Sequence, residues 1–194
     1  MFQLRESSQL YLLKLSRQSI QDFLQFGRKP DEIPSSEELL EKRGAFVTLH
    51  KKELLRGCIG CLAPLLPLYR TIIDCSVSAA VEDPRFPPLI LQELSELEIE
   101  ISLLSPPKDV DNILDIEIGT HGLIVSCGGK RGLLLPQVPL RYCWNRERFL
   151  QETCRKAGLS PDEWQKGAKI ECFTALIFRE RQTIAECGMR REDH

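Results

Sequence analysis

Apolar and charged residues alternate most regularly in the stretch LEIEISLL, residues 97–104. Its odd positions are apolar, and Glu98 and Glu100 lie between them. Successive side chains of a strand point to opposite faces of its sheet. The pattern therefore predicts a strand with one buried face and one solvent-exposed face, as is common in antiparallel sheets.

Other stretches also predict strands, and two tight turns join pairs of them. The turns are expected at Lys51-Lys52-Glu53 and at Gly128-Gly129, where the residue types suit β-hairpins. The expected strands are AFVTLHK (45–51), LLRGCIGCL (54–62), the two segments flanking Gly128-Gly129, and KIECFTALIF (169–178).

A repeat of apolar residues every three to four positions predicts helices. The first should end at Gly27. Another should begin at Pro67 and end before Pro84, with an apolar stripe formed by Leu68, Ile72, Ile73, Val77, Ala80 and Val81. Asn145 can cap a further helix that runs to Gly158.

A capping-box pattern, Ser35-x-x-Glu38, predicts a short helix that ends at Gly44. The order of helices and strands favours an α+β fold with a mixed, antiparallel-rich sheet flanked by helices. We expect one domain over residues 1–180, followed by a charged C-terminal tail, 181–194.

Composition narrows the classes of function. The chain has 194 residues, 42% hydrophobic content and a net charge of −2. This charge gives no electrostatic reason to expect nucleic acid or an anionic membrane as a partner. Proline or charge interrupts each apolar stretch before the roughly 18 residues of a membrane span. Without an export signal, we expect a cytoplasmic protein whose eight cysteines are mostly reduced.

Two cysteines lie three positions apart, at Cys58 and Cys61. In a strand they point to opposite faces, with Cα atoms roughly 10 Å apart, whereas a disulfide requires less than about 7 Å. No second C-x-x-C or H-x₃-H pair occurs, so we expect no metal site.

Cys58 itself has two readings. Gly57 and Gly60 would let a ligand or another backbone approach closely, and Arg56 on the same face would favour the thiolate. Alternatively, the glycines permit tight sheet packing and Cys58 is an inert buried thiol.

Five blocks of sequence occur in an order that resembles the AMMECR family. They are LRGCIG (55–60), EDPRFPPL (82–89), EIEISLLSPP (98–107), HGLIV (121–125) and LLPQV (134–138). The resemblance extends from the first helix to Phe178 and implies a soluble α+β domain with two unequal lobes. Family members usually carry Thr or Ser where this chain has Cys61, so Cys58 is the family position.

The resemblance implies partners but no settled reaction. Prokaryotic members, called AmmeMemoRadiSam system protein A, are similar to proteins encoded beside, or fused to, Memo-like and radical-SAM proteins. This chain has no three-cysteine cluster for an iron–sulfur centre, so we expect no cofactor of its own. Any such chemistry would belong to a partner.

The candidate site combines residues from two of these blocks. We expect Arg56, Cys58, Asp83 and Arg85 to converge on one cleft that suits an anionic small molecule, with Asp83 holding Arg85. Equally, Asp83 and Arg85 could be a structural pair in a proline-rich loop. His121 is a second catalytic candidate beside Cys58, or else a turn histidine.

Three functions remain open. The chain could be a binding or partner component of a Memo/radical-SAM pathway. It could be an enzyme that uses Cys58 on an anionic small molecule, or a structural adaptor. We expect His50 to lie at the surface, and Trp144 and Trp164 to be packing residues.

Overall fold

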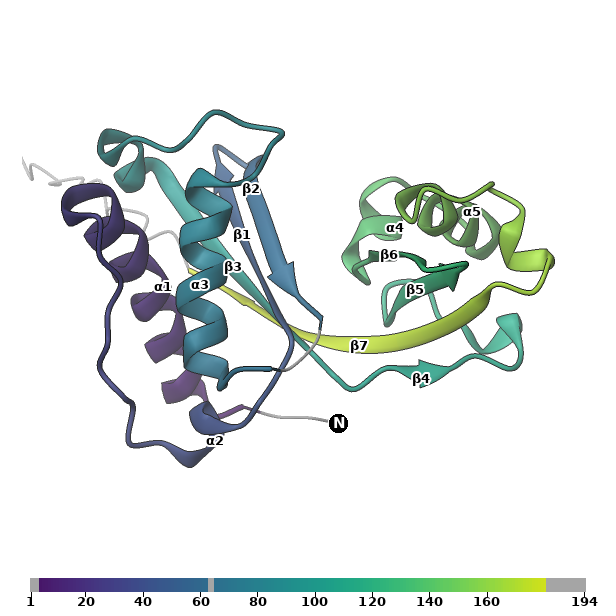
Figure 1. Ribbon diagram of the computed structural model, residues 1–194, viewed down its shortest axis with the longest axis horizontal. Helices are drawn as coiled ribbons and strands as arrows, with labels where there is room; N and C mark the ends of the chain where they lie inside the picture. The colour runs from purple at the N-terminus through teal and green to yellow at the C-terminus, as the bar shows by residue number, and fades with distance from the viewer. Residues whose placement is uncertain (1–3, 63–64, 181–194) are drawn as a thin grey trace, which may run out of the picture.

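The computed structural model describes residues 4–62 and 65–180, which form two unequal lobes (Figure 1). The larger lobe contains α1 (Glu6–Phe26), α2 (Glu37–Leu40), β1 (Ala45–Lys51), β2 (Leu54–Cys61), α3 (Leu68–Val81), the 3₁₀ helix η1 (Leu91–Glu96) and β3 (Leu97–Leu104). The smaller lobe contains β4 (Lys108–Asp109), η2 (Ile113–Asp115), β5 (His121–Cys127), β6 (Lys130–Leu134), α4 (Gln137–Arg141), α5 (Arg146–Lys156) and η3 (Glu163–Gln165).

One long strand, β7 (Lys169–Arg179), runs through both lobes. The strand order is β2-β1-β3-β7-β5-β6, and β4 also pairs with β7. The C-terminal half of β7 pairs with β3, and its N-terminal half pairs with β5. Every pairing among the described strands is antiparallel, which confirms the predicted α+β class.

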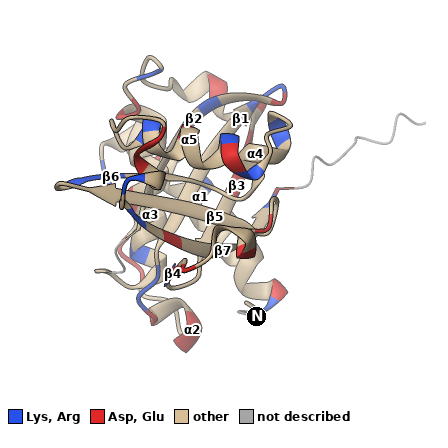
Figure 2. Ribbon diagram, turned by 90° about the vertical axis from the view of Figure 1, so that its right-hand side faces the viewer, with Lys and Arg blue, Asp and Glu red and all other residues tan. Residues whose placement is uncertain are grey.

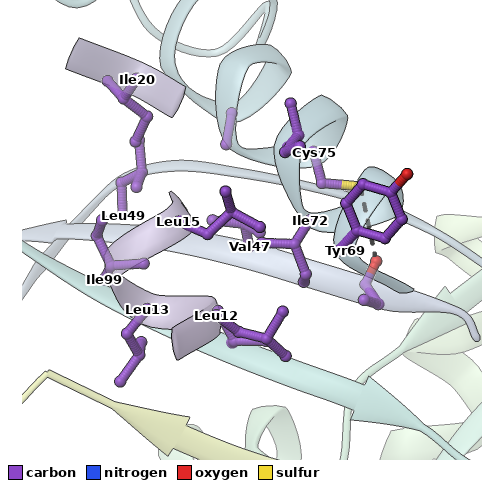
Figure 3. Packing of buried hydrophobic residues seen from close by; sticks show 14 of the residues in the cluster. Leu12, Leu13, Leu15, Ile20, Val47, Leu49, Tyr69, Ile72, Cys75 and Ile99 are labelled. Atoms are coloured by element: carbon purple, nitrogen blue, oxygen red, sulfur yellow. Dashed lines mark hydrogen bonds between the residues drawn. The ribbon is translucent and has the colours of Figure 1, made fainter. Parts of the chain in front are cut away.

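The main core lies between the larger lobe's sheet and helices α1 and α3. Val47, Leu49, Ile99 and Ile101 have no exposed surface, and they face the helices as the alternation predicted. Figure 3 shows side chains of α1, β1 and α3 meeting in this layer. The apolar stripe predicted after Pro67 is the buried face of α3.

Glycine, capping and turn residues in the sequence predicted where most helices and strands begin or end. Helix α1 ends at Gly27, which adopts a left-handed conformation with a φ of 67°. Helix α5 begins after Asn145, whose side chain accepts a hydrogen bond from the Arg148 N–H. Lys52 and Glu53 both have positive φ and form the β1–β2 turn. None of the described helices is long and apolar enough to cross a lipid bilayer.

The short helix α2 differs from the prediction. It begins at Glu37 and ends at Leu40 rather than Gly44, without a side-chain cap. The Glu38 carboxylate, expected in a capping box, instead accepts a hydrogen bond from Ser8 of α1. A tertiary contact therefore replaces the local cap.

The second face of β3 is not solvent-exposed, contrary to the prediction. Glu98 is 8% exposed and Ser102 is fully buried. Arg179 Nε lies 3.4 Å from the Glu98 carboxylate. Gln137 Nε2 of α4 donates a hydrogen bond to the Ser102 hydroxyl at 3.4 Å. The polar face of β3 is covered by β7 and by the smaller lobe. The predicted tail, 181–194, lies outside the described residues.

Candidate functional site

A cavity of about 770 Å³ lies between the lobes, and we refer to it as the interlobe cavity. The larger lobe contributes Phe46, Thr48, His50, Leu55, Cys58, Gly60, Leu62, Arg85 and Glu100 to its lining. The smaller lobe contributes Arg131, Gly132, Leu133, Leu134, Leu135, Gln137, Val138, Arg141, Tyr142, Trp144 and Lys156.

Sheet register places three polar side chains in a row along the cavity wall. Thr48 of β1 pairs with Cys58 of β2 on one side and with Glu100 of β3 on the other. Directly paired residues point to the same face of a sheet. The Thr48 hydroxyl donates a hydrogen bond to the Cys58 sulfur at 3.3 Å.

Asp83 and Arg85 hold the backbone of Cys58 at the outer edge of β2. The Asp83 carboxylate accepts the Cys58 N–H at 2.8 Å, and Arg85 Nη2 donates to the Cys58 carbonyl at 3.2 Å. Arg85 also donates to Asp83 from Nε at 2.9 Å and from Nη2 at 2.7 Å. These bonds from Arg85 keep the pKa of Asp83 well below its usual value. The loop thus satisfies the backbone groups that a further strand would otherwise satisfy.

Arg56 does not join this cluster, contrary to the expected convergence of four residues. Its guanidinium binds Glu93 of η1 through Nη2 at 2.9 Å and Nε at 3.2 Å. Arg56 is absent from the cavity lining. The Glu93 carboxylate therefore binds the Arg56 side chain, which the strand pattern alone placed beside Cys58.

Polar residues that the sequence did not identify as site residues also line the cavity, among them His50, Glu100 and Gln137. His50, expected at the surface, has a side chain only 17% exposed, and its Nε2 lies 4.0 Å from the Glu100 carboxylate. Gln137 donates from Nε2 to Glu100 at 3.3 Å. Alternation with buried Val47 places Thr48 and His50 on one face of β1, but the sequence did not indicate that the smaller lobe covers this face. Nothing in the sequence near Gln137 indicated a contact with β3.

The charges along the cavity are mostly positive. Arg85 is paired with Asp83, and Arg131 with Glu171 at 3.3 Å. Arg141 and Lys156 have no ion-pair partner among residues 4–62 and 65–180. Basic and acidic residues are interspersed over the outer face of the smaller lobe (Figure 2). The excess of positive charge is therefore local to the cavity.

Comparisons with known proteins identify the family and the fold. The AMMECR1 family model matches residues 13–178. The chain belongs to the AMMECR1 family.

Relatives of the AMMECR1 chain match it along almost its whole length. "Protein MK0488" of Methanopyrus kandleri is 45% identical over 182 residues, covering 89% of this chain and 88% of that protein. A protein of Methanosarcina acetivorans is 44% identical, covering 94% and 96%. The crystal structure of uncharacterized protein PH0010 from Pyrococcus horikoshii has a TM-score of 0.89 and 41% identity, covering 93% of this chain and 95% of that one.

The two glycines of the AMMECR1 block LRGCIG serve packing. A Cβ at Gly57 would overlap the Ala79 carbonyl of α3, and a Cβ at Gly60 would overlap the Phe46 ring. Gly57 faces the helices and Gly60 faces the cavity. The close approaches seen at both positions are those of protein atoms, as the packing alternative predicted.

Cys58 and Cys61 point to opposite sides of β2, as the alternation predicted. Cys58 lines the cavity, Cys61 packs against the core of the larger lobe, and neither forms a disulfide. Burial raises the pKa of Cys58 above its usual value, and the opposing effects of Thr48 and Arg85 are smaller. This direction of the pKa shift opposes the thiolate character expected for Cys58.

His121 lies apart from Cys58 and does not line the cavity. Its Nδ1 accepts the backbone N–H of Glu117 at 3.1 Å, which closes the turn before β5. Trp144 lines the cavity and stacks with Tyr142 at a centroid distance of 5.0 Å. Trp164 packs in the core of the smaller lobe. Among the described residues, no three His, Cys, Asp or Glu side chains gather as metal ligands would.

Proposed function

We propose that this AMMECR1 domain binds an anionic small molecule in the interlobe cavity, as the binding component of a pathway shared with Memo-like and radical-SAM proteins. The observation that carries the proposal is the pair of cations, Arg141 and Lys156, that line the cavity without an ion-pair partner among the described residues.

The lining suits a small organic anion. Leu133, Leu135 and Val138 provide an apolar wall, and Arg141 and Lys156 supply charge beside it. Binding sites for small molecules commonly combine apolar walls with a few fixed polar groups. An arginine guanidinium can also hold a carboxylate or phosphate through two hydrogen bonds.

The proposed partnership draws on the family and on the chemistry of the chain. Prokaryotic members of the family are similar to proteins encoded beside, or fused to, Memo-like and radical-SAM proteins. The described residues contain no cluster of metal ligands, and redox chemistry would then be supplied by a partner. In this arrangement the AMMECR1 domain holds the anion that the partner uses or produces.

The test is equilibrium binding of defined anions, measured by isothermal titration calorimetry with benzoate, inorganic phosphate and pyrophosphate. We expect at least one of them to bind, and the double variant Arg141→Met/Lys156→Met to weaken it by about tenfold or more. The control is Arg148→Met, because Arg148 pairs with Glu152 on α5 and does not line the cavity. Equal affinity in wild type and double variant would refute the proposed site.

A second candidate function is a reaction at Cys58. Its sulfur lines the same cavity, accepts a hydrogen bond from Thr48, and lies on a backbone fixed by Asp83 and Arg85. If Cys58 is a nucleophile, Cys58→Ser should keep anion affinity and abolish turnover of the bound anion. If Cys58→Ser changes neither, the thiol has no chemical role. Partner assembly that persists without any anion binding would favour a structural adaptor.

A further inference from the structure

The wall of the interlobe cavity formed by β1, β3 and the start of α4 carries hydrogen-bond acceptors. The Glu100 carboxylate accepts from Gln137 Nε2 at 3.3 Å. An ionised carboxylate only accepts hydrogen bonds, so this contact fixes the orientation of the Gln137 amide. The amide oxygen, Oε1, is therefore the atom of Gln137 that remains for another donor.

Two polar atoms in this wall are buried without a hydrogen-bond partner among the described residues. They are Gln137 Oε1 and His50 Nε2. His50 Nε2 lies 4.0 Å from the Glu100 carboxylate, which is too far for a hydrogen bond. Buried polar atoms of native proteins nearly always have partners. Both residues line the cavity, so a small adjustment of either side chain would let a bound molecule supply the missing partner.

One of the cavity's cations, Arg141, lies one helical turn away from Gln137. Gln137 and Arg141 are the first and last residues of α4, and both line the cavity. Residues four apart on a helix lie on the same face, with Cβ atoms about 6 Å apart. The cavity therefore has an acceptor-rich end at Gln137 and Glu100 and a cationic end at Arg141.

We propose that the ligand is an anion that carries a hydroxyl or amino donor about one helical turn from its charged group. The donor binds Gln137 Oε1 and the Glu100 carboxylate, and the charged group binds Arg141. A hydroxyl at this position can also pair with His50 Nε2, because a hydroxyl both donates and accepts. This inference rests on the proposed function and adds the chemistry of the ligand's second end.

The test compares rigid probes that differ only in the group opposite the carboxylate. The probes are 4-hydroxybenzoate, which has a donor and a charge; 4-methoxybenzoate, which can accept but not donate; and benzoate. We expect wild-type protein to bind 4-hydroxybenzoate about five- to tenfold more tightly than benzoate, as one added hydrogen bond allows. 4-Methoxybenzoate should bind no more tightly than benzoate.

Two variants test which residues cause the preference for 4-hydroxybenzoate over benzoate. Gln137→Met keeps the length of the side chain but removes the amide oxygen, and it should bring the affinities of 4-hydroxybenzoate and benzoate together. Arg141→Met should weaken both acids by the same factor and leave their ratio unchanged. Thermal unfolding of each variant reports whether it folds, and the wild-type comparison with 4-methoxybenzoate does not depend on any variant.

The outcomes separate this inference from the proposed function. If all three acids bind equally and Arg141→Met weakens them equally, the cavity binds anions and the donor inference is wrong. Tighter binding of 4-methoxybenzoate than of benzoate, matching the hydroxyl compound, would also refute it. Binding that Arg141→Met leaves unchanged but Arg141→Met/Lys156→Met weakens would refute this inference alone, because Lys156 also lines the cavity. Binding that the double variant leaves unchanged, or no binding at millimolar concentration, would refute the proposed site and this inference together.

Discussion

The Asp83 carboxylate accepts the backbone N–H of Cys58 at 2.8 Å, across 25 positions of sequence. Arg85, held by the same carboxylate, donates to the carbonyl of Cys58. Both backbone groups of one residue on an edge strand are therefore fixed by a loop that follows α3. This fixes the position of the Cys58 side chain in the cavity wall, whether or not the thiol reacts.

Removal of the Asp83 carboxylate should destabilise the protein strongly. Its side chain is 2% exposed, and it accepts hydrogen bonds from Cys58, from the Arg85 backbone and from the Arg85 side chain. We expect Asp83→Ala to lower the free energy of unfolding by about 2–4 kcal/mol, measured by urea denaturation. Asp74→Ala is the control, because Asp74 is 46% exposed in a surface pair with Lys29, and its loss should be below about 1 kcal/mol. Similar losses in the two variants would contradict this role.

The Glu93–Arg56 pair should make stability depend on acid pH. Hydrogen bonds from Arg56 lower the pKa of Glu93 from 4.5 to about 2. Because the pKa is lower in the folded state, the stabilisation is fully present above about pH 4.5 and is lost as the pH falls through about 2. We expect Glu93→Gln to cost about 1–3 kcal/mol at pH 7, and its difference from wild type to vanish near pH 2.

Urea titrations at a series of pH values measure this difference. Glu96→Gln is a control from the same 3₁₀ helix, because Glu96 is 46% exposed and forms a surface ion pair with Lys51. Its cost at pH 7 should be below about 1 kcal/mol. A Glu93→Gln difference that is the same at pH 7 and near pH 2 would show that the charge of Glu93 does not stabilise the fold.

Truncation of Ile101 should create a cavity in the main core. The side chain has no exposed surface, so we expect Ile101→Ala to cost about 2–5 kcal/mol in chemical denaturation. Ile33→Ala removes the same atoms at a position 67% exposed and should cost less than about 0.5 kcal/mol. A loss below that value at Ile101 would mean that the strand does not face the helices.

The packing role of Gly57 can be separated from backbone strain. A Cβ at Gly57 would overlap the Ala79 carbonyl, whereas Gly128 has positive φ and open space around it. We expect Gly128→Ala to cost about 1 kcal/mol from its backbone conformation alone. Gly57→Ala should cost more than twice as much in the same denaturation assay, because α3 must move away from β2. Equal costs would mean that α3 can shift freely.

Alkylation rates should report the raised pKa of Cys58. With iodoacetamide at neutral pH, we expect the Cys58 peptide to be labelled more slowly than that of exposed Cys143, and faster as the pH rises. Arg85→Gln should slow labelling of Cys58 further, because the charge of Arg85 lowers the pKa of the thiol. Arg56→Gln should have no effect. Cys58→Ser identifies the peptide, and rates equal to those of Cys143 would contradict the raised pKa.

Regular local patterns were enough to predict the main elements. The alternation around Ile99 and Ile101 defined β3, and the residues after Pro67 defined α3. The family blocks also predicted that Cys58 and the Asp83 loop lie close together, and the structure shows a hydrogen bond between them. These inferences succeeded because each depends on neighbours in sequence or on motifs that occur as a unit.

The remaining features depend on segments far apart in the chain. Arg56 was assigned to Cys58 because a strand pattern cannot reveal that Glu93 competes for it. His50 was placed at the surface because the pattern of β1 does not indicate that a second lobe covers its polar face. Gln137 belongs to a helix of five residues with no periodic signal. The acceptor-rich end of the cavity is thus a product of tertiary structure.

Strand β7 also determines when the protein can finish folding during synthesis. It is the last described strand, yet it lies between β3 and β5 in the sheet. Before β7 leaves the ribosome, β3 lacks its second neighbour and β5 pairs only with β6. Neither lobe can complete its sheet before its part of β7 is available. A nascent chain that stops before Lys169 would expose unpaired strand edges in both lobes at once, and such edges promote association with other chains.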